Sequence, residues 1–149
     1  ITTVLSNPEY LKWMKDEIVN LYRAYGITKV VGIESRGFIL GPAVAMDLGA
    51  GFVPVRKPGK LPAETIEVSY AKEYGVDTIQ IHADALNEND VVLLHDDLLA
   101  TGGSMAAALE LVRKFNVKKV YINFIIELEF LNGRKAIGDD VEISSLMSC

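Results

Sequence analysis

The chain has 149 residues, of which 50% are hydrophobic and 23% are charged, a composition typical of a folded globular domain and not of a disordered chain. Its length suits one domain with a sizeable core, and no apolar run approaches the roughly 20 residues of a membrane-spanning helix. The formal net charge of −5 argues against a general nucleic-acid-binding surface. The single cysteine, Cys149, excludes an intrachain disulfide and fits a reducing compartment, so we expect a cytoplasmic protein.

The first predicted element is a helix that begins at Pro8 and is stopped by Gly26. Ser6 and Asn7 precede it, and both are residue types that cap helix N-termini. Apolar side chains then recur at helical spacing, and we interpret them as core packing. They are Leu11, Met14, Ile18, Leu21 and Tyr25.

The elements that follow alternate between strands and helices. The expected strands are 29–33, 51–57, 90–96, 118–128 and 141–147, and the expected helices are 37–49 and 104–115. Between residues 64 and 84, two further strands joined through Glu73 to Asp77 read as an antiparallel excursion. The apolar runs lack polar alternation, which indicates an α/β fold with a mainly parallel central sheet flanked by helices.

Four unusual stretches follow the ends of these strands. They are "ESRG" (34–37), "RKPGK" (56–60), "DDLLATGGS" (96–104) and "ELEFLNGR" (127–134). In parallel sheets, ligands bind beyond the carboxyl ends of the strands. The sequence therefore predicts a binding site at this edge.

The stretch "ATGGSM" predicts an anion site at the start of a helix. Gly102 and Gly103 allow a tight turn that exposes successive N–H groups, and Thr101 and Ser104 add hydroxyl donors. A Walker loop is excluded because no Lys precedes the Ser or Thr, and "GIESRG" lacks the glycine spacing of a dinucleotide fingerprint. A plain strand-to-helix turn with a Ser cap is the alternative.

Asp96 and Asp97 immediately precede this turn. Two carboxylates at a strand end can accept hydrogen bonds from vicinal hydroxyls. A ligand with a diol for these acids and a phosphate for the glycine turn is a sugar phosphate. Each stretch also has a plainer reading. The acids could form a solvated turn, "ESRG" a helix start with an exposed Arg, "RKPGK" a solvated loop, and "AKEYG" an ordinary hairpin tip.

Taken together, the stretches resemble the type I phosphoribosyltransferases. "VVLLHDDLLATGGSM" is similar to the phosphoribosyl pyrophosphate motif of that family, in the version found in adenine phosphoribosyltransferases. "GIESRGFILGP", "VPVRKPGKLP", "SYAKEYG" and "ELEFLNGR" match the family in the same order, so the resemblance covers essentially the whole chain. It implies the type I phosphoribosyltransferase fold, a single domain over residues 1–149, and an antiparallel lid over the site.

The resemblance also implies substrate contacts. Asp96 and Asp97 would bind the ribose hydroxyls. The 5′-phosphate would be held by Ala100, Thr101, Gly102, Gly103 and Ser104. Pyrophosphate would be bound by Ser35, Arg36, Arg56, Lys57, Lys60 and Tyr74.

Two residues take catalytic roles by the same resemblance. Arg36 would meet the leaving group, and Glu73 would exchange a proton with the purine, since a carboxylate enclosed with its substrate can act as a general acid or base. Leu98 and Leu128 would contact the base, although packing at a loop edge explains them equally well. The peptide bond between Glu34 and Ser35 is expected to be cis.

The implied reaction is Mg²⁺-dependent transfer of ribose 5-phosphate from phosphoribosyl pyrophosphate to adenine, giving AMP and pyrophosphate in purine salvage. Mg²⁺ would be held through substrate and water, with no direct protein ligand. A homodimer is expected, in which a cation of "RKPGK" could cross the interface, and no nucleic acid or membrane is expected as a partner.

The sequence departs from the family's pattern at one point, and this leaves the identity of the purine base undecided. Relatives carry an N-terminal segment that recognises adenine, and nothing here precedes "ITTVL" (1–5) to match it. A phosphoribosyltransferase for xanthine, hypoxanthine or guanine is therefore an alternative. So is a non-enzymatic regulator that senses phosphoribosyl pyrophosphate.

Overall fold

The computed structural model describes residues 2–149. The helices are α1 (Thr2–Leu5), α2 (Pro8–Tyr22), α3 (Gly37–Leu48), α4 (Gly103–Arg113), the 3-10 turn η1 (Glu129–Leu131) and α5 (Gly133–Ile137). The strands are β1 (Lys29–Ile33), β2 (Gly51–Val55), β3 (Thr65–Lys72), β4 (Gly75–His82), β5 (Val91–Leu99), β6 (Lys119–Glu127) and β7 (Glu142–Ser148).

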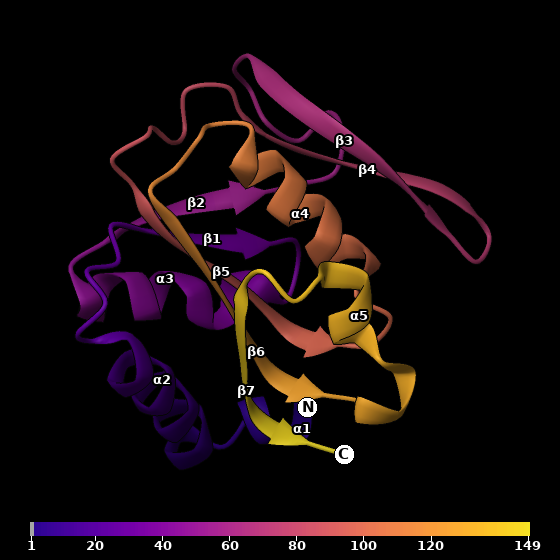
Figure 1. Ribbon diagram of the computed structural model, residues 1–149. Coiled ribbons are helices and arrows are strands. Elements are labelled where there is room, and N and C mark those ends of the chain that lie inside the picture. The colour runs from indigo at the N-terminus through magenta and orange to yellow at the C-terminus, as the bar shows by residue number, and fades with distance from the viewer. Residues whose placement is uncertain (1) are drawn as a thin grey trace.

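Five strands form the central sheet, in the order β2-β1-β5-β6-β7, and every neighbouring pair is parallel. The strands β3 and β4 form a separate antiparallel hairpin that extends beyond the sheet (Figure 1). The predicted α/β class, parallel sheet and antiparallel excursion are all confirmed.

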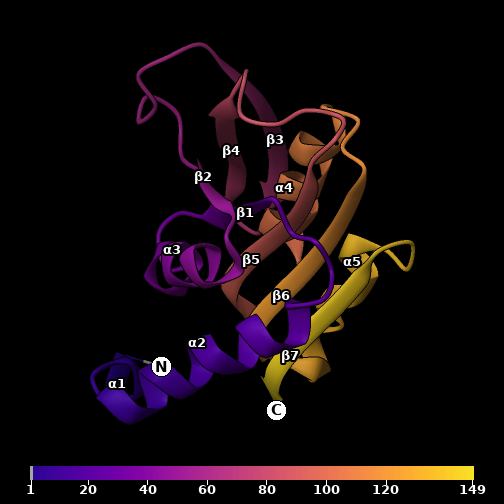
Figure 2. The same ribbon diagram turned by 90° about the vertical axis from the view of Figure 1, so that its left-hand side faces the viewer.

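The central sheet separates two hydrophobic cores, one on each face. On one face, α2 and α3 pack against β1, β5 and β6 through side chains such as Met14, Val30 and Leu93 (Figures 1 and 2). On the other face, α4 and the hairpin pack through side chains such as Met105 and Ile81. Burial on both faces explains why the strands lack polar alternation.

The helix α2 begins as predicted but ends earlier. Asn7 caps it, because its side-chain oxygen accepts hydrogen bonds from the N–H groups of Glu9 and Tyr10, at 3.0 and 3.3 Å. The helix ends at Tyr22, four residues before Gly26, which adopts a φ of +70°. Assigning Leu21 and Tyr25 to the core was wrong, since they are 45% and 43% exposed. The buried positions in this part of the helix are Ile18, Val19 and Tyr22.

Three other boundaries differ in ways that concern the site. The strand β5 continues three residues beyond the predicted end at Asp96, to Leu99, so Asp97 also lies within the strand. The hairpin turn is shorter than predicted, because Lys72 pairs with Gly75 and leaves only Glu73 and Tyr74 between the strands. The elements η1 and α5, after β6, were not predicted.

Among residues 2–149, no helix combines the length and the apolar character needed to cross a bilayer.

The Asn7 cap gives a test of the fold. Replacing Asn7 with Ala should lower the free energy of unfolding by about 1 kcal/mol, because two N–H groups lose their acceptor. For a chain of this size, thermal denaturation should show a Tm lower by roughly 2–4 °C. The control is Asn20→Ala, on an exposed position near the end of the same helix, which should leave the Tm unchanged or slightly higher.

Candidate active site

The turn after β1 meets the end of β5 through an ion pair. The Nε atom of Arg36 lies 2.9 Å from Oδ2 of Asp97. The Asp97 side chain is 6% exposed, whereas that of Arg36 is 53% exposed. A half-solvated guanidinium thus compensates a buried carboxylate, and two residues predicted to bind different parts of one substrate are in direct contact.

Asp96, the residue before Asp97 in β5, points to the opposite face of the strand and is half-buried. Burial raises the pKa of Asp96 to about 7, and the nearby charge of Asp97 adds to this shift. The N–H of Asp97 donates to Oδ1 of Asp96 at 2.8 Å and opposes the shift, as does the positive charge of Arg36. The two acids are therefore in unlike environments, one paired with Arg36 and one held in a site that disfavours its charge.

The glycine turn predicted to bind phosphate opens α4. Gly102 precedes the helix with a φ of +88°, a left-handed conformation that glycine adopts without strain. The helix runs for 11 residues from Gly103, so its first N–H groups and the positive end of its dipole face the carboxyl edge of the sheet. Thr101 and Ser104 flank this N-terminus. An anion could therefore be bound next to Asp96 and Asp97.

The basic loop after β2 is connected to the turn after β1. Oε1 of Glu34 accepts hydrogen bonds from Arg56 Nε at 3.0 Å and from the Lys57 N–H at 3.1 Å. Burial would raise the pKa of Glu34, but these two donors and the charges of Arg56 and Lys60 outweigh it, so the pKa is lowered. The predicted cis bond between Glu34 and Ser35 is present. This geometry holds the Arg56 side chain and the Lys57 backbone beside the site.

The hairpin borders two cavities of the site, both open to solvent. The larger has a volume of about 750 Å³ and is lined by Glu73 and Tyr74 on one side and by Thr101, Gly103 and Ser104 on the other. The smaller, of about 220 Å³, is bordered by Glu34, Arg56, Lys57, Asp96 and Ser104. The structure thus brings together the acids, the glycine turn, part of the basic loop and the hairpin tip.

The two residues predicted to contact the base also lie at this edge. Leu98 is half-buried and pairs with Ile126 of β6. Leu128 is half-buried and donates its N–H to the carbonyl of Leu99 at 2.9 Å. They are neighbours at the ends of β5 and β6, and neither lines the two cavities under the hairpin.

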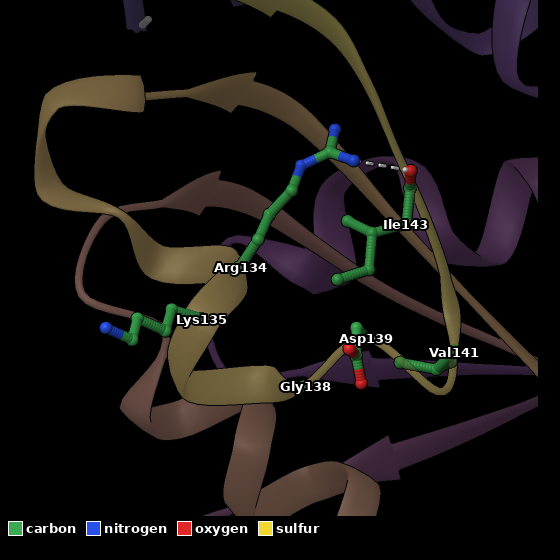
Figure 3. Close-up of a pocket in the computed structure, with 6 residues that line it drawn as sticks. All are labelled: Arg134, Lys135, Gly138, Asp139, Val141 and Ile143. Atoms are coloured by element: carbon green, nitrogen blue, oxygen red, sulfur yellow. Dashed lines mark hydrogen bonds between the residues drawn. The ribbon is translucent and has the colours of Figure 1, made fainter.

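A further cavity, of about 520 Å³, contains none of the predicted site residues. It lies beside α5 and β7, and Figure 3 shows Arg134 reaching across it to the carbonyl of Ile143. Lys135 points away from that contact.

Three residues of the hairpin reach the site without having been singled out in the sequence. Tyr70 borders both cavities under the hairpin, and Lys72 and Asp77 border one each. Tyr70 OH donates to Oδ2 of Asp77 at 3.4 Å, and burial raises the pKa of Tyr70. The alternation of side chains along β3 was the available signal, because Tyr70 and Lys72 point to the same face of a strand.

Residues 2–149 hold no group of three or more His, Cys, Asp or Glu side chains placed to bind a metal ion.

Comparison with known proteins identifies the family. The model of the phosphoribosyl transferase domain matches residues 1–139. The adenine phosphoribosyltransferase of Bacteroides thetaiotaomicron is 64% identical over 148 residues, which cover 99% of this chain and 84% of the relative. The chain belongs to the phosphoribosyl transferase domain family.

Solved structures agree with this assignment. An APRTase from Giardia lamblia, complexed with 9-deazaadenine, superposes with a TM-score of 0.94 at 45% identity, covering 99% of this chain and 84% of that one. The adenine phosphoribosyl transferase of Trypanosoma brucei, in complex with AMP, pyrophosphate and ribose-5-phosphate, gives 0.90 at 32% identity, with 97% and 67% covered. The fold is that of the type I phosphoribosyltransferases.

The raised pKa of Asp96 predicts a pH-dependent gain of stability on substitution. An Asp whose pKa is about 7 when folded and near 4 when unfolded binds a proton more tightly in the folded state, so its contribution to stability falls as pH rises from 4 to 7. Asp96→Asn keeps the acceptor for the Asp97 N–H and removes the charge. We expect the variant to gain stability relative to the natural chain between pH 4 and pH 8, by at most about 4 kcal/mol.

Urea denaturation of both proteins at pH 4.5 and pH 8 measures this difference. His95, whose pKa burial lowers to about 4, titrates in both proteins and cancels from the comparison. The matched control is Asp139→Asn at an exposed acid. A stability difference between Asp96→Asn and the natural chain that is the same at both pH values contradicts the prediction.

Proposed function

We propose that this protein transfers ribose 5-phosphate from phosphoribosyl pyrophosphate to adenine, giving AMP and pyrophosphate. The observation that carries the proposal is the meeting of Asp96 and Asp97 with the glycine turn of α4 beneath the hairpin. The choice of adenine is supported by the relatives, which are adenine phosphoribosyltransferases at 64% and 63% identity.

In this proposal, the sugar phosphate is held at two points. The N–H groups at the start of α4 and the hydroxyls of Thr101 and Ser104 bind the 5′-phosphate, together with the backbone of Ala100. Asp96 and Asp97 accept hydrogen bonds from the ribose hydroxyls. Two fixed points on one sugar orient C1′, and such orientation lowers the entropic part of the barrier.

The leaving pyrophosphate is stabilised by positive charge. As the bond between C1′ and the pyrophosphate oxygen breaks, negative charge develops on pyrophosphate, and preorganised cations are most effective there. Arg36, Arg56, Lys57 and Lys60 supply that charge, with Ser35 and Tyr74 as hydrogen-bond donors. Mg²⁺ is expected on oxygens of the substrate and on water, where it would neutralise the same charge.

Glu73 is assigned the proton transfer. A nitrogen of adenine forms the new bond to C1′ and releases a proton, which the carboxylate at the hairpin tip would accept. The hairpin would also exclude water, which otherwise hydrolyses the activated sugar. Leu98 and Leu128 would contact the base from the ends of β5 and β6.

We further propose that residues 1–149 act as one phosphoribosyltransferase domain, supported by the family match and the single central sheet. The homodimer and the cytoplasmic location stay predictions. Sedimentation of the purified protein tests the first.

The direct test is turnover of purified protein with phosphoribosyl pyrophosphate, Mg²⁺ and one base at a time. We expect AMP from adenine, and rates at least a hundredfold lower with hypoxanthine, guanine and xanthine. If another purine is turned over in preference to adenine, that purine is the substrate and the choice of adenine is wrong. Binding of phosphoribosyl pyrophosphate without turnover of any base would favour a sensor.

Glu73→Gln tests the proton transfer. The amide keeps the size of the side chain but accepts no proton, so we expect kcat to fall by about 10²–10⁴-fold while the KM for phosphoribosyl pyrophosphate changes little. Glu88→Gln, an exposed acid in the loop before β5 and so at the opposite edge of the sheet, is the control. An unchanged kcat in Glu73→Gln would remove this residue from the mechanism.

A further inference from the structure

The phosphate loop, residues 100–104, is in backbone contact with the start of α5. A Cβ atom on Gly102 would lie 2.3 Å from the carbonyl oxygen of Gly133. A Cβ atom on Gly133 would lie 2.5 Å from the carbonyl oxygen of Ala100 and 2.6 Å from Cδ1 of Leu99. No side chain fits at either glycine, so the position of α5 fixes the position of the loop.

The helix α5 is in turn held by one arginine. Nε and Nη2 of Arg134 each lie 2.8 Å from a carboxylate oxygen of Glu127, which ends β6. Nη1 donates to the carbonyl of Ile143 in β7 at 3.1 Å (Figure 3). Arg134 therefore ties α5 to two neighbouring strands of the sheet.

The carboxylate that receives this arginine is itself fixed. Glu127 is 8% exposed and also accepts a hydrogen bond from Ser145 Oγ at 2.9 Å. The donors of Arg134 lower the pKa of Glu127, so the pair stays charged at neutral pH. A two-pronged contact of this kind needs the planar fork of arginine, which lysine lacks.

Besides Arg134, α5 is held by its packing against α4 and by the contacts of Gly133 and Ala136 with the loop. The helix has five residues, too few to be stable on its own, and its buried side chain is Ile137. Its orientation therefore depends on tertiary contacts, among which those of Arg134 are the side-chain hydrogen bonds that join it to β6 and β7.

We propose that Arg134 and Gly133 are positioning residues for the 5′-phosphate. Arg134 positions α5 against the sheet, and Gly133 positions the phosphate loop through direct backbone contact. This inference rests on the proposed function, because it takes residues 100–104 to be the phosphate-binding loop. Arg134 acts through the loop and not on the ligand, since its hydrogen bonds go to Glu127 and Ile143.

Arg134→Lys and Gly133→Ala test the inference. The first keeps the charge and loses the fork, and the second pushes α5 away from the loop. Affinities for ribose 5-phosphate and for pyrophosphate are measured separately by calorimetry, with Tm recorded for each variant. We expect ribose 5-phosphate to bind at least tenfold more weakly in both variants, and pyrophosphate to bind within twofold of the natural chain.

Two controls match these variants. Arg113 also pairs with an acid, Asp140, at 3.1 Å, and its side chain is 45% exposed against 47% for Arg134. Gly51 lies at the amino edge of the sheet, where an added Cβ meets only the flexible end of Lys29 at 3.2 Å. Arg113→Lys and Gly51→Ala should leave both affinities within twofold.

The outcomes separate this inference from the proposed function. Equal weakening of both ligands, or no weakening of ribose 5-phosphate, overturns the positioning role while the function stands. If the natural chain binds neither ribose 5-phosphate nor AMP, the proposed function fails and this inference fails with it. Should Gly133→Ala not fold, the result with Arg134→Lys decides.

Discussion

The site depends on the parallel alignment of β1, β5 and β6. In this register Gly32, His95 and Asn123 lie side by side, so the segments that follow them leave the sheet at one edge. A close approach then joins two of those segments, because a Cβ atom on Gly37 would lie 2.9 Å from the carbonyl oxygen of His95. That approach lets Arg36, one residue earlier, reach Asp97.

The same reasoning explains how much the sequence could predict. The apolar runs indicated the strands, and parallel strands must place the stretches that follow them at one edge, so the meeting of Asp96, the glycine turn and the basic loop could be predicted from the order of the residues alone. The ion pair between Arg36 and Asp97 could not, because it depends on a close backbone contact that leaves no periodic signal. The helix α5 was missed for a related reason, since five residues are too few to show helical periodicity. Leu21 was misassigned because an apolar residue at helical spacing can still face solvent.

Asp96 lowers the stability of the fold at neutral pH when no ligand is bound. Asp97 is compensated by Arg36, whereas Asp96 is held where burial disfavours its charge. A ligand whose hydroxyls donate hydrogen bonds to both carboxylates would offset part of this loss of stability. Such a ligand would bind more tightly here than to two fully solvated carboxylates. In the proposed function, Asp96 would thus lower the stability of the fold and raise its affinity for the sugar, a trade that is common at functional sites.

The two sides of the cleft differ in how firmly they are held. The phosphate loop is fixed by α4 on one side and by α5 on the other, and both helices pack into the core through buried side chains such as Met105 and Ile137. The hairpin is anchored at its base by Val68 and Ile81, while Tyr74 at its tip is 86% exposed. A sugar phosphate would therefore meet a preformed cradle, whereas Glu73 sits next to an exposed side chain at the tip of the hairpin. In the proposed function, the cradle would bind the phosphate without rearranging, and the tip would gain contacts only once a ligand lies beneath it.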